Sequence, residues 1–156
     1  LALRAAAILR DRGFDFRWYF VGDGDDRAKL EKMIDTLSLC DKIIIMGYLM
    51  NPYPYIGSCD IYVQPSYEES FGLAVMEARI LGRAIVSTDT VGCRIVLETG
   101  RNGIITPITA EGLADGIAEL LTDEQKRKSF ENKYPAEDNL REKAVYADSW
   151  DILLSG

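Results

Sequence analysis

Short apolar runs alternate with longer amphipathic segments through most of this 156-residue chain. The runs occupy residues 14–21, 42–46, 60–64, 84–87 and 104–106. Between them, apolar residues recur at helical spacing, as in Leu30, Met33, Ile34 and Leu37. Strands that alternate with helices are typical of a parallel sheet covered on both faces. The alternation predicts an α/β fold with a Rossmann-like, doubly wound parallel sheet. A last amphipathic segment, predicted at 140–154, ends the chain.

Composition limits the classes of partner. The length fits one domain, and 47% hydrophobic residues suffice for a packed core. Eighteen basic and 25 acidic residues give a net charge of −7, so we expect no nucleic-acid partner. No apolar run is long enough for a transmembrane helix.

Histidine is absent, which excludes Ser-His-Asp and Cys-His catalysis and removes the commonest metal ligand. Cys40, Cys59 and Cys93 have no metal-ligand spacing and are interpreted as reduced thiols of a cytosolic protein. Any general base must therefore be a carboxylate, a lysine, a cysteine or a tyrosine.

The loops that follow the predicted strands are rich in glycine and polar residues. They include 22–24, 47–48, 65–71 and 88–92. Right-handed crossovers bring such loops to one edge of the sheet, where open α/β sheets bind ligands. The first loop, GDGDDR at 22–27, is a poor dinucleotide motif because Arg27 stands where a small residue is needed. Its aspartates, Asp23 and Asp25, are interpreted as helix-capping residues rather than metal ligands.

The most informative stretch is 65–78, where a strand, a polar loop with Gly72 and a helix follow one another. Backbone amides at 70–73 (Ser70, Phe71, Gly72, Leu73) are suited to an anion such as a diphosphate. Glu77 lies among apolar helix residues, so we expect it to have a specific partner. The hydroxyl pair of a ribose is a suitable one, because one carboxylate accepts from both hydroxyls.

Several motifs in order resemble the retaining GT-B-fold glycosyltransferases of the group one type. They are ESFGLAVMEA at 69–78, GRAIVS at 82–87, DIYVQPS at 60–66, VGDG at 21–24 and NG at 102–103. The resemblance covers nearly the whole chain. It implies the C-terminal, donor-binding half of a two-domain, metal-independent enzyme that needs no cofactor.

The resemblance also implies roles for individual residues. Glu77 would hold the ribose of a nucleoside-diphosphate sugar, and Ser70, Phe71, Gly72 and Leu73 would offer amides to the diphosphate and sugar. Glu69 would lie beside the transferred sugar as the catalytic or sugar-positioning carboxylate. Gly47 and Tyr48 would border the base.

The chain departs from the family pattern in three respects. VGCR at 91–94 replaces the usual second glycine and glutamate, leaving Arg94 either as a cation near the site or as a surface residue. The family's first strand, with an Arg and a Lys for the donor phosphates, is expected to be missing, as is the acceptor domain. That strand would lie between the strands that end at Val21 and Gln64. We therefore expect the chain to close the gap locally or to borrow an edge by self-association.

The sequence thus predicts a fragment, residues 1–156, of an enzyme that transfers a hexose from a nucleotide sugar to a saccharide or lipid-linked acceptor. The complete enzyme is expected in the cytoplasm or peripheral to the inner face of the membrane, and the fragment alone is expected to be inactive. Two alternatives stay open. One is a nucleotide-sugar epimerase of the same fold, and the other is a non-catalytic binding or scaffolding domain.

Overall fold

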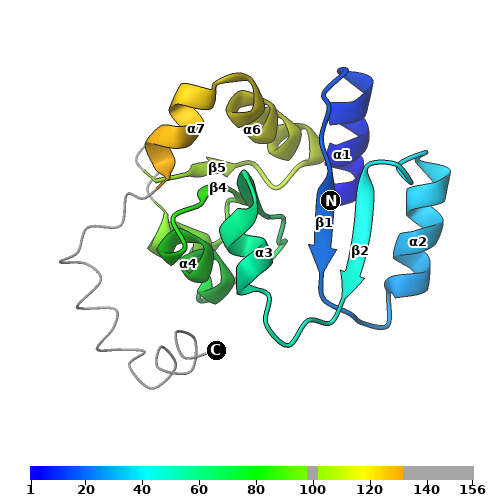
Figure 1. Ribbon diagram of the computed structural model, residues 1–156, viewed down its shortest axis with the longest axis horizontal. Helices are drawn as coiled ribbons and strands as arrows, with labels where there is room; N and C mark the ends of the chain where they lie inside the picture. The colour runs from blue at the N-terminus through cyan, green and yellow to red at the C-terminus, as the bar shows by residue number, and fades with distance from the viewer. Residues whose placement is uncertain (98–101, 132–156) are drawn as a thin grey trace.

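The computed structural model describes residues 1–97 and 102–131, and its five strands form two parallel sheets (Figure 1). One sheet pairs β1 (Trp18–Val21) with β2 (Ile43–Gly47). The other has the order β3-β4-β5, with β3 (Ile61–Gln64), β4 (Ala84–Thr88) and β5 (Ile104–Thr106). All these pairs are parallel, as the alternation of strands and helices predicts.

Seven helices connect and cover the strands in the described part of the chain. They are α1 (Ala2–Asp11), α2 (Arg27–Thr36), α3 (Tyr53–Ser58), α4 (Leu73–Ile80), α5 (Val91–Val96), α6 (Ala110–Thr122) and α7 (Glu124–Phe130). Figure 1 shows α6 and α7 over β4 and β5, α3 and α4 on the other side of these strands, and α2 beside β2. The described helices include none that is both long and apolar enough to cross a bilayer.

The central strand β4 shows why the sheet is doubly wound. All five of its residues are buried. Ala84 and Val86 pack in a cluster with α1 and α6, whereas Ile85 packs in a second cluster with residues of α4 and α5. Because successive side chains of a strand point to opposite faces, helices on both sides are needed to cover this apolar run.

The two sheets are not hydrogen-bonded to each other within the described residues, since β1 pairs only with β2 and β3 only with β4. The break falls between the strands that end at Val21 and Gln64, where the resemblance places the family's first strand. The expectation that the chain closes this gap locally is therefore wrong for the described strands. Pairing with a neighbouring molecule stays a prediction.

Some boundaries differ from the sequence-based expectations. β1 begins at Trp18 rather than at residue 14, and α5 begins at Val91, immediately after the β4 loop. The N-cap of α2 is Asp26 rather than Asp23 or Asp25, and its side chain makes no capping bond. Oδ1 of Asp23 accepts instead from the amide of Gly24, within the loop. The segment predicted at 140–154 lies outside the described residues.

Candidate functional site

The loop between β3 and α4 is folded back on the carboxylate of Glu69. Oε1 of Glu69 accepts hydrogen bonds from the amides of Phe71 and Gly72, at 3.2 and 3.0 Å. Gly72, at φ 68°, adopts the left-handed conformation that starts α4. These amides therefore point toward a negative charge, here supplied by the chain itself, at the start of a helix where an anion is stabilised.

A second glycine supports the loop from α5. The amide of Gly92 donates to the carbonyl oxygen of Glu69 at 2.7 Å. A Cβ atom on Gly92 would lie 2.6 Å from the amide nitrogen of Gly72 and 2.7 Å from that of Phe71. Only a residue without a side chain permits this approach. Gly92 was not among the predicted site residues, although a glycine in the loop after a strand is a visible signal.

Glu77 is half-buried on α4, and its carboxylate has a hydrogen-bond partner within the chain. The hydroxyl of Tyr53 donates to Oε1 of Glu77 at 3.3 Å. No cation pairs with Glu77 in the part of the chain that the structure describes. Burial raises the pKa of Glu77, and the hydrogen bond from Tyr53 acts in the opposite direction. Sequence reasoning missed Tyr53, because nothing in its local sequence connects it with a helix 24 residues away.

Buried polar groups fix the start of the β3–α4 loop. The hydroxyl of Tyr62 donates to Oε1 of Gln64 at 2.9 Å, and Nε2 of Gln64 donates to Oγ of Ser66 at 2.8 Å. Oγ1 of Thr88, on β4, donates to the carbonyl oxygen of Ser66 at 2.5 Å. Burial is the main reason that the pKa of Tyr62 is raised far above its usual range, so its hydroxyl remains a donor. These hydrogen bonds therefore hold the end of β3 and the start of the loop in place.

The predicted residues fall into two groups. Glu69, Ser70, Phe71, Gly72, Leu73 and Glu77 come together on the β3–α4 loop and helix, with the Phe71 side chain 71% exposed. Gly47 is the last residue of β2 in the other sheet, and Tyr48 follows it. The carbonyl of Gly47 accepts from the amide of Gly22 at 2.8 Å. Among the described residues, no hydrogen bond or ion pair joins this second group to the first.

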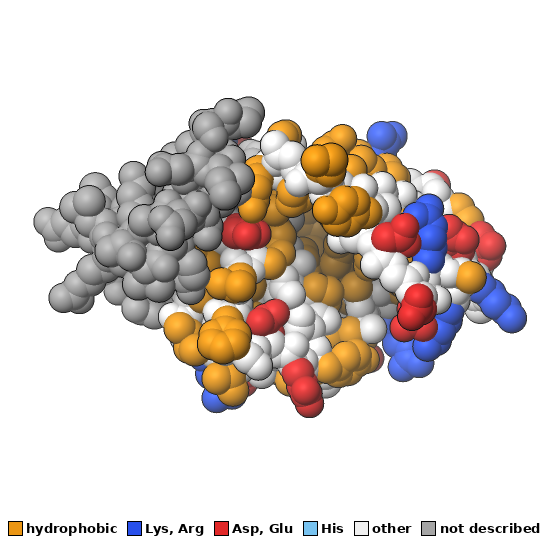
Figure 2. All heavy atoms as spheres, turned by 90° about the horizontal axis from the view of Figure 1, so that it is seen from below, with side chains coloured by type: hydrophobic (Ala, Val, Ile, Leu, Met, Phe, Trp, Pro, Cys, Tyr) orange, Lys and Arg blue, Asp and Glu red, His pale blue; other side chains and the backbone are white. Residues whose placement is uncertain are grey.

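Two arginines near the site, Arg27 and Arg94, are already paired with carboxylates. Arg94, on α5, is exposed and forms an ion pair with Asp89 through two hydrogen bonds. Arg27 pairs with Glu31 at 3.0 Å and with Asp23 at 3.7 Å. Figure 2 shows the side toward which β1 and β2 point in Figure 1, where apolar and acidic side chains surround a hollow and Lys and Arg lie mostly at one end. Arg27 and Arg94 therefore offer little free positive charge to a diphosphate.

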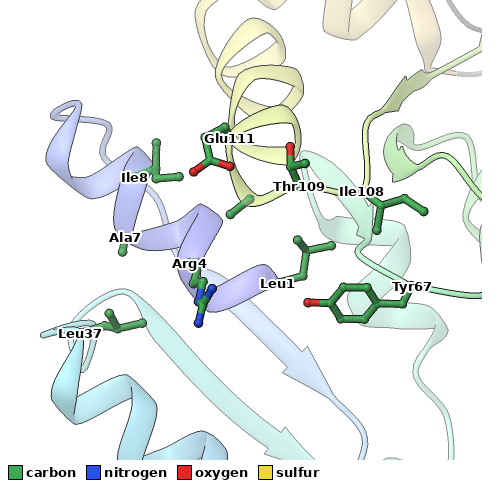
Figure 3. Close-up of a pocket in the computed structure, with 10 residues that line it drawn as sticks. Leu1, Arg4, Ala7, Ile8, Leu37, Tyr67, Ile108, Thr109 and Glu111 are labelled. Carbon is green, nitrogen blue, oxygen red and sulfur yellow. The ribbon is translucent and has the colours of Figure 1, made fainter.

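A cavity of about 470 Å³ lies beside the β3–α4 loop without including Glu69 or Glu77. Its lining comes from residues 1–8 at the start of the chain, Leu37 after α2, Tyr67, and residues 108–111 at the start of α6. Figure 3 shows the Tyr67 hydroxyl pointing toward Leu1. Glu77 and the loop amides thus lie on the neighbouring surface, outside this cavity.

Comparison with known proteins gives a consistent result. The family described as "Glycosyl transferases group 1" matches residues 1–136. The chain is 32% identical over 137 residues to an alpha-D-kanosaminyltransferase of Streptomyces kanamyceticus, covering 85% of this chain and 36% of that protein.

A second relative, from Campylobacter jejuni, is an N-acetylgalactosaminyltransferase whose name specifies a diphospho-undecaprenol acceptor. It is 28% identical over 135 residues, covering 85% of this chain and 36% of that protein. The chain thus spans about a third of the length of these curated relatives.

A solved structure, of Anabaena HepE in complex with UDP and glucose, superposes with a TM-score of 0.79 at 25% identity. The match covers 90% of this chain and 39% of that protein. The shared architecture is the Rossmann-like C-terminal domain of GT-B glycosyltransferases. The chain belongs to the glycosyl transferases group 1 family.

Proposed function

We propose that this chain is the donor-binding part of an enzyme that transfers a hexose from a nucleoside-diphosphate sugar to a saccharide or lipid-linked acceptor, with retention at the anomeric carbon. The observation that carries the proposal is Glu77: a half-buried carboxylate that pairs with no cation among the described residues, five residues after the left-handed Gly72 at the start of the same helix. A carboxylate has acceptor sites for both hydroxyls of a ribose, even with one bond from Tyr53 in place.

The amides of the β3–α4 loop complete the donor site in this proposal. Phe71 and Gly72 donate to Glu69 in the structure, which shows that their N–H groups converge on one negative charge. The donor's diphosphate or sugar takes this position, with Ser70 and Leu73 extending the row of amides. Glu69 then turns to the transferred sugar, whose developing positive charge its carboxylate stabilises. Gly47 and Tyr48 border the base from the other sheet.

The relatives support this choice of substrates. The HepE structure holds UDP and glucose, which is the chemistry of a nucleotide-sugar donor. The kanosaminyltransferase and the Campylobacter enzyme are named for sugar transfer, the latter to a lipid-linked acceptor. We propose the same substrate classes for this protein. We also propose that the complete enzyme lies in the cytoplasm or at the inner face of the membrane.

The broken sheet adds a structural part to the proposal. β1 and β3 each have one partner in the described chain, so each has one edge unpaired. We propose that a further strand lies between them, either from polypeptide outside residues 1–156 or from a second copy. Polypeptide outside these residues would also supply the cations that the donor phosphates need.

The experiment is a transfer assay on the complete protein with nucleoside-diphosphate hexoses and a panel of saccharide and lipid-linked acceptors. NMR of the product reports the anomeric configuration. We expect acceptor-dependent transfer with retention, and loss of transfer without loss of donor binding in Glu69→Gln. Donor turnover in the absence of any acceptor would instead support an epimerase.

A further inference from the structure

Tyr53 occupies a position from which its hydroxyl donates a hydrogen bond to Glu77. It is the first residue of α3, which follows the β2 loop, whereas Glu77 lies on α4. Its amide donates to Oδ1 of Asn51 at 3.1 Å, and Pro52 precedes it as the N-cap of α3. These local restraints fix the start of the helix, and they direct the phenol to Oε1 of Glu77.

The other groups near Glu77 are engaged elsewhere. Tyr62, on β3, is electrostatically coupled to Glu77, but its hydroxyl donates to Gln64. On α5, Arg94 pairs with Asp89, and Cys93 is a buried thiol. The guanidinium of Arg79, two residues along α4, donates to the carbonyl of Val96. β4 carries no titratable side chain.

Tyr53 and Glu77 shift each other's pKa in directions that preserve the hydrogen bond between them. Burial raises the pKa of Glu77, and the Tyr53 hydrogen bond opposes this rise. Burial first, and the Glu77 charge second, raise the pKa of Tyr53, so the phenol remains a donor at neutral pH. A hydrogen bond from a neutral donor favours the ionised carboxylate. The ionised form is the one that accepts from two hydroxyls at once.

We propose that Tyr53 is a positioning residue for Glu77, holding its carboxylate ionised and oriented for the hydroxyl pair of the donor's ribose. The proposal rests on the function proposed above for Glu77. One carboxylate oxygen is fixed by Tyr53, and the remaining acceptor sites face the ligand. Tyr53 thereby extends donor recognition to α3, an element in which no site residue was predicted.

The test compares Tyr53→Phe with Tyr55→Phe in the complete protein. Tyr55 lies two residues further along α3, its side chain is exposed, and no hydrogen bond of its hydroxyl is among the described contacts, so it is a matched control. Carbon-13 labelling of glutamate carboxyls follows the titration of Glu77, assigned by its loss in Glu77→Gln. Unchanged shifts of the other glutamates show that the fold is kept.

We expect the Glu77 titration to move to higher pH in Tyr53→Phe and to stay unchanged in Tyr55→Phe. Calorimetry with UDP is expected to show about fivefold weaker binding in Tyr53→Phe at neutral pH. The deficit should grow as the pH is lowered and the carboxylate is protonated, and it should shrink at higher pH. A merely structural role for Tyr53 would give a deficit that does not depend on pH.

An identical Glu77 titration in wild type and Tyr53→Phe would overturn the proposal. So would UDP binding that is unaffected by Tyr53→Phe at every pH. If the wild-type protein binds no UDP while the titration still moves, the proposed function fails, and the structural coupling of Tyr53 to Glu77 is supported on its own.

Discussion

The backbones of Gly72 and Gly92 are in direct contact, so that a Cβ atom added to Gly92 would lie 2.6 Å from the amide nitrogen of Gly72. Gly72 is the N-cap of α4 and Gly92 is the second residue of α5, and these helices follow different strands of one sheet. Their contact fixes the β3–α4 loop against α5 and so sets the position of the amides that face Glu69.

Gly92→Ala is therefore expected to lower the free energy of unfolding by about 1–3 kcal/mol, because the methyl group would meet backbone atoms that cannot move aside. Urea denaturation measures the loss. Gly57→Ala is the control: no atom lies within 4 Å of its added Cβ, and the helical position should gain about 0.5–1 kcal/mol. Equal stability of the two variants would contradict the close approach.

Glu77→Ala in the complete protein is expected to raise the dissociation constant for the nucleotide-sugar donor by about tenfold or more, because a charge-assisted pair of hydrogen bonds is lost. Calorimetry measures the change. Glu68→Ala, in the exposed part of the β3–α4 loop, is the matched control and should bind the donor normally. Unchanged binding by Glu77→Ala would refute the ribose assignment.

Glu77 is also expected to reduce stability at neutral pH. Burial raises the pKa of Glu77 in the folded state. The protonated group therefore stabilises the fold below the unfolded-state pKa, and this contribution is lost as the pH rises through the folded-state pKa. Glu77→Gln should therefore unfold at higher urea concentration than wild type at about pH 7.5, by a few tenths of a kcal/mol after allowing for solvent screening. At about pH 3.5, where the carboxylate is largely neutral, the difference should disappear. A constant difference across this range would show that the charge is not its cause.

The unpaired edges of β1 and β3 predict that residues 1–156 associate with one another in solution, because exposed strand edges are templates for pairing. Sedimentation velocity over a range of concentrations measures this association. Tyr19→Lys places a charge on β1, where the side chain is already 47% exposed, and should weaken the association. A monomer at every concentration would argue against pairing between copies.

Much of the architecture was predictable because it depends on local patterns. The apolar runs and the helical spacing between them indicated a parallel α/β fold, and the glycine at position 72 indicated the turn into α4. Glu77 was identifiable for the same reason: a carboxylate among apolar helix residues requires a partner. The gap in the sheet beside β1 was also predictable from the sequence, but only through the resemblance to the glycosyltransferase family.

The tertiary structure alone decided which groups meet. Tyr53 reaches Glu77 across 24 residues, and Gly92 reaches Gly72 across 20, because strands and crossovers bring the ends of separate segments together. It also showed that the carboxylate of Glu69 accepts hydrogen bonds from the loop amides, and that Arg94 beside the site is paired with Asp89. Periodicity determines which face of an element is buried, whereas the partner of a single polar atom depends on packing between segments that are distant in sequence.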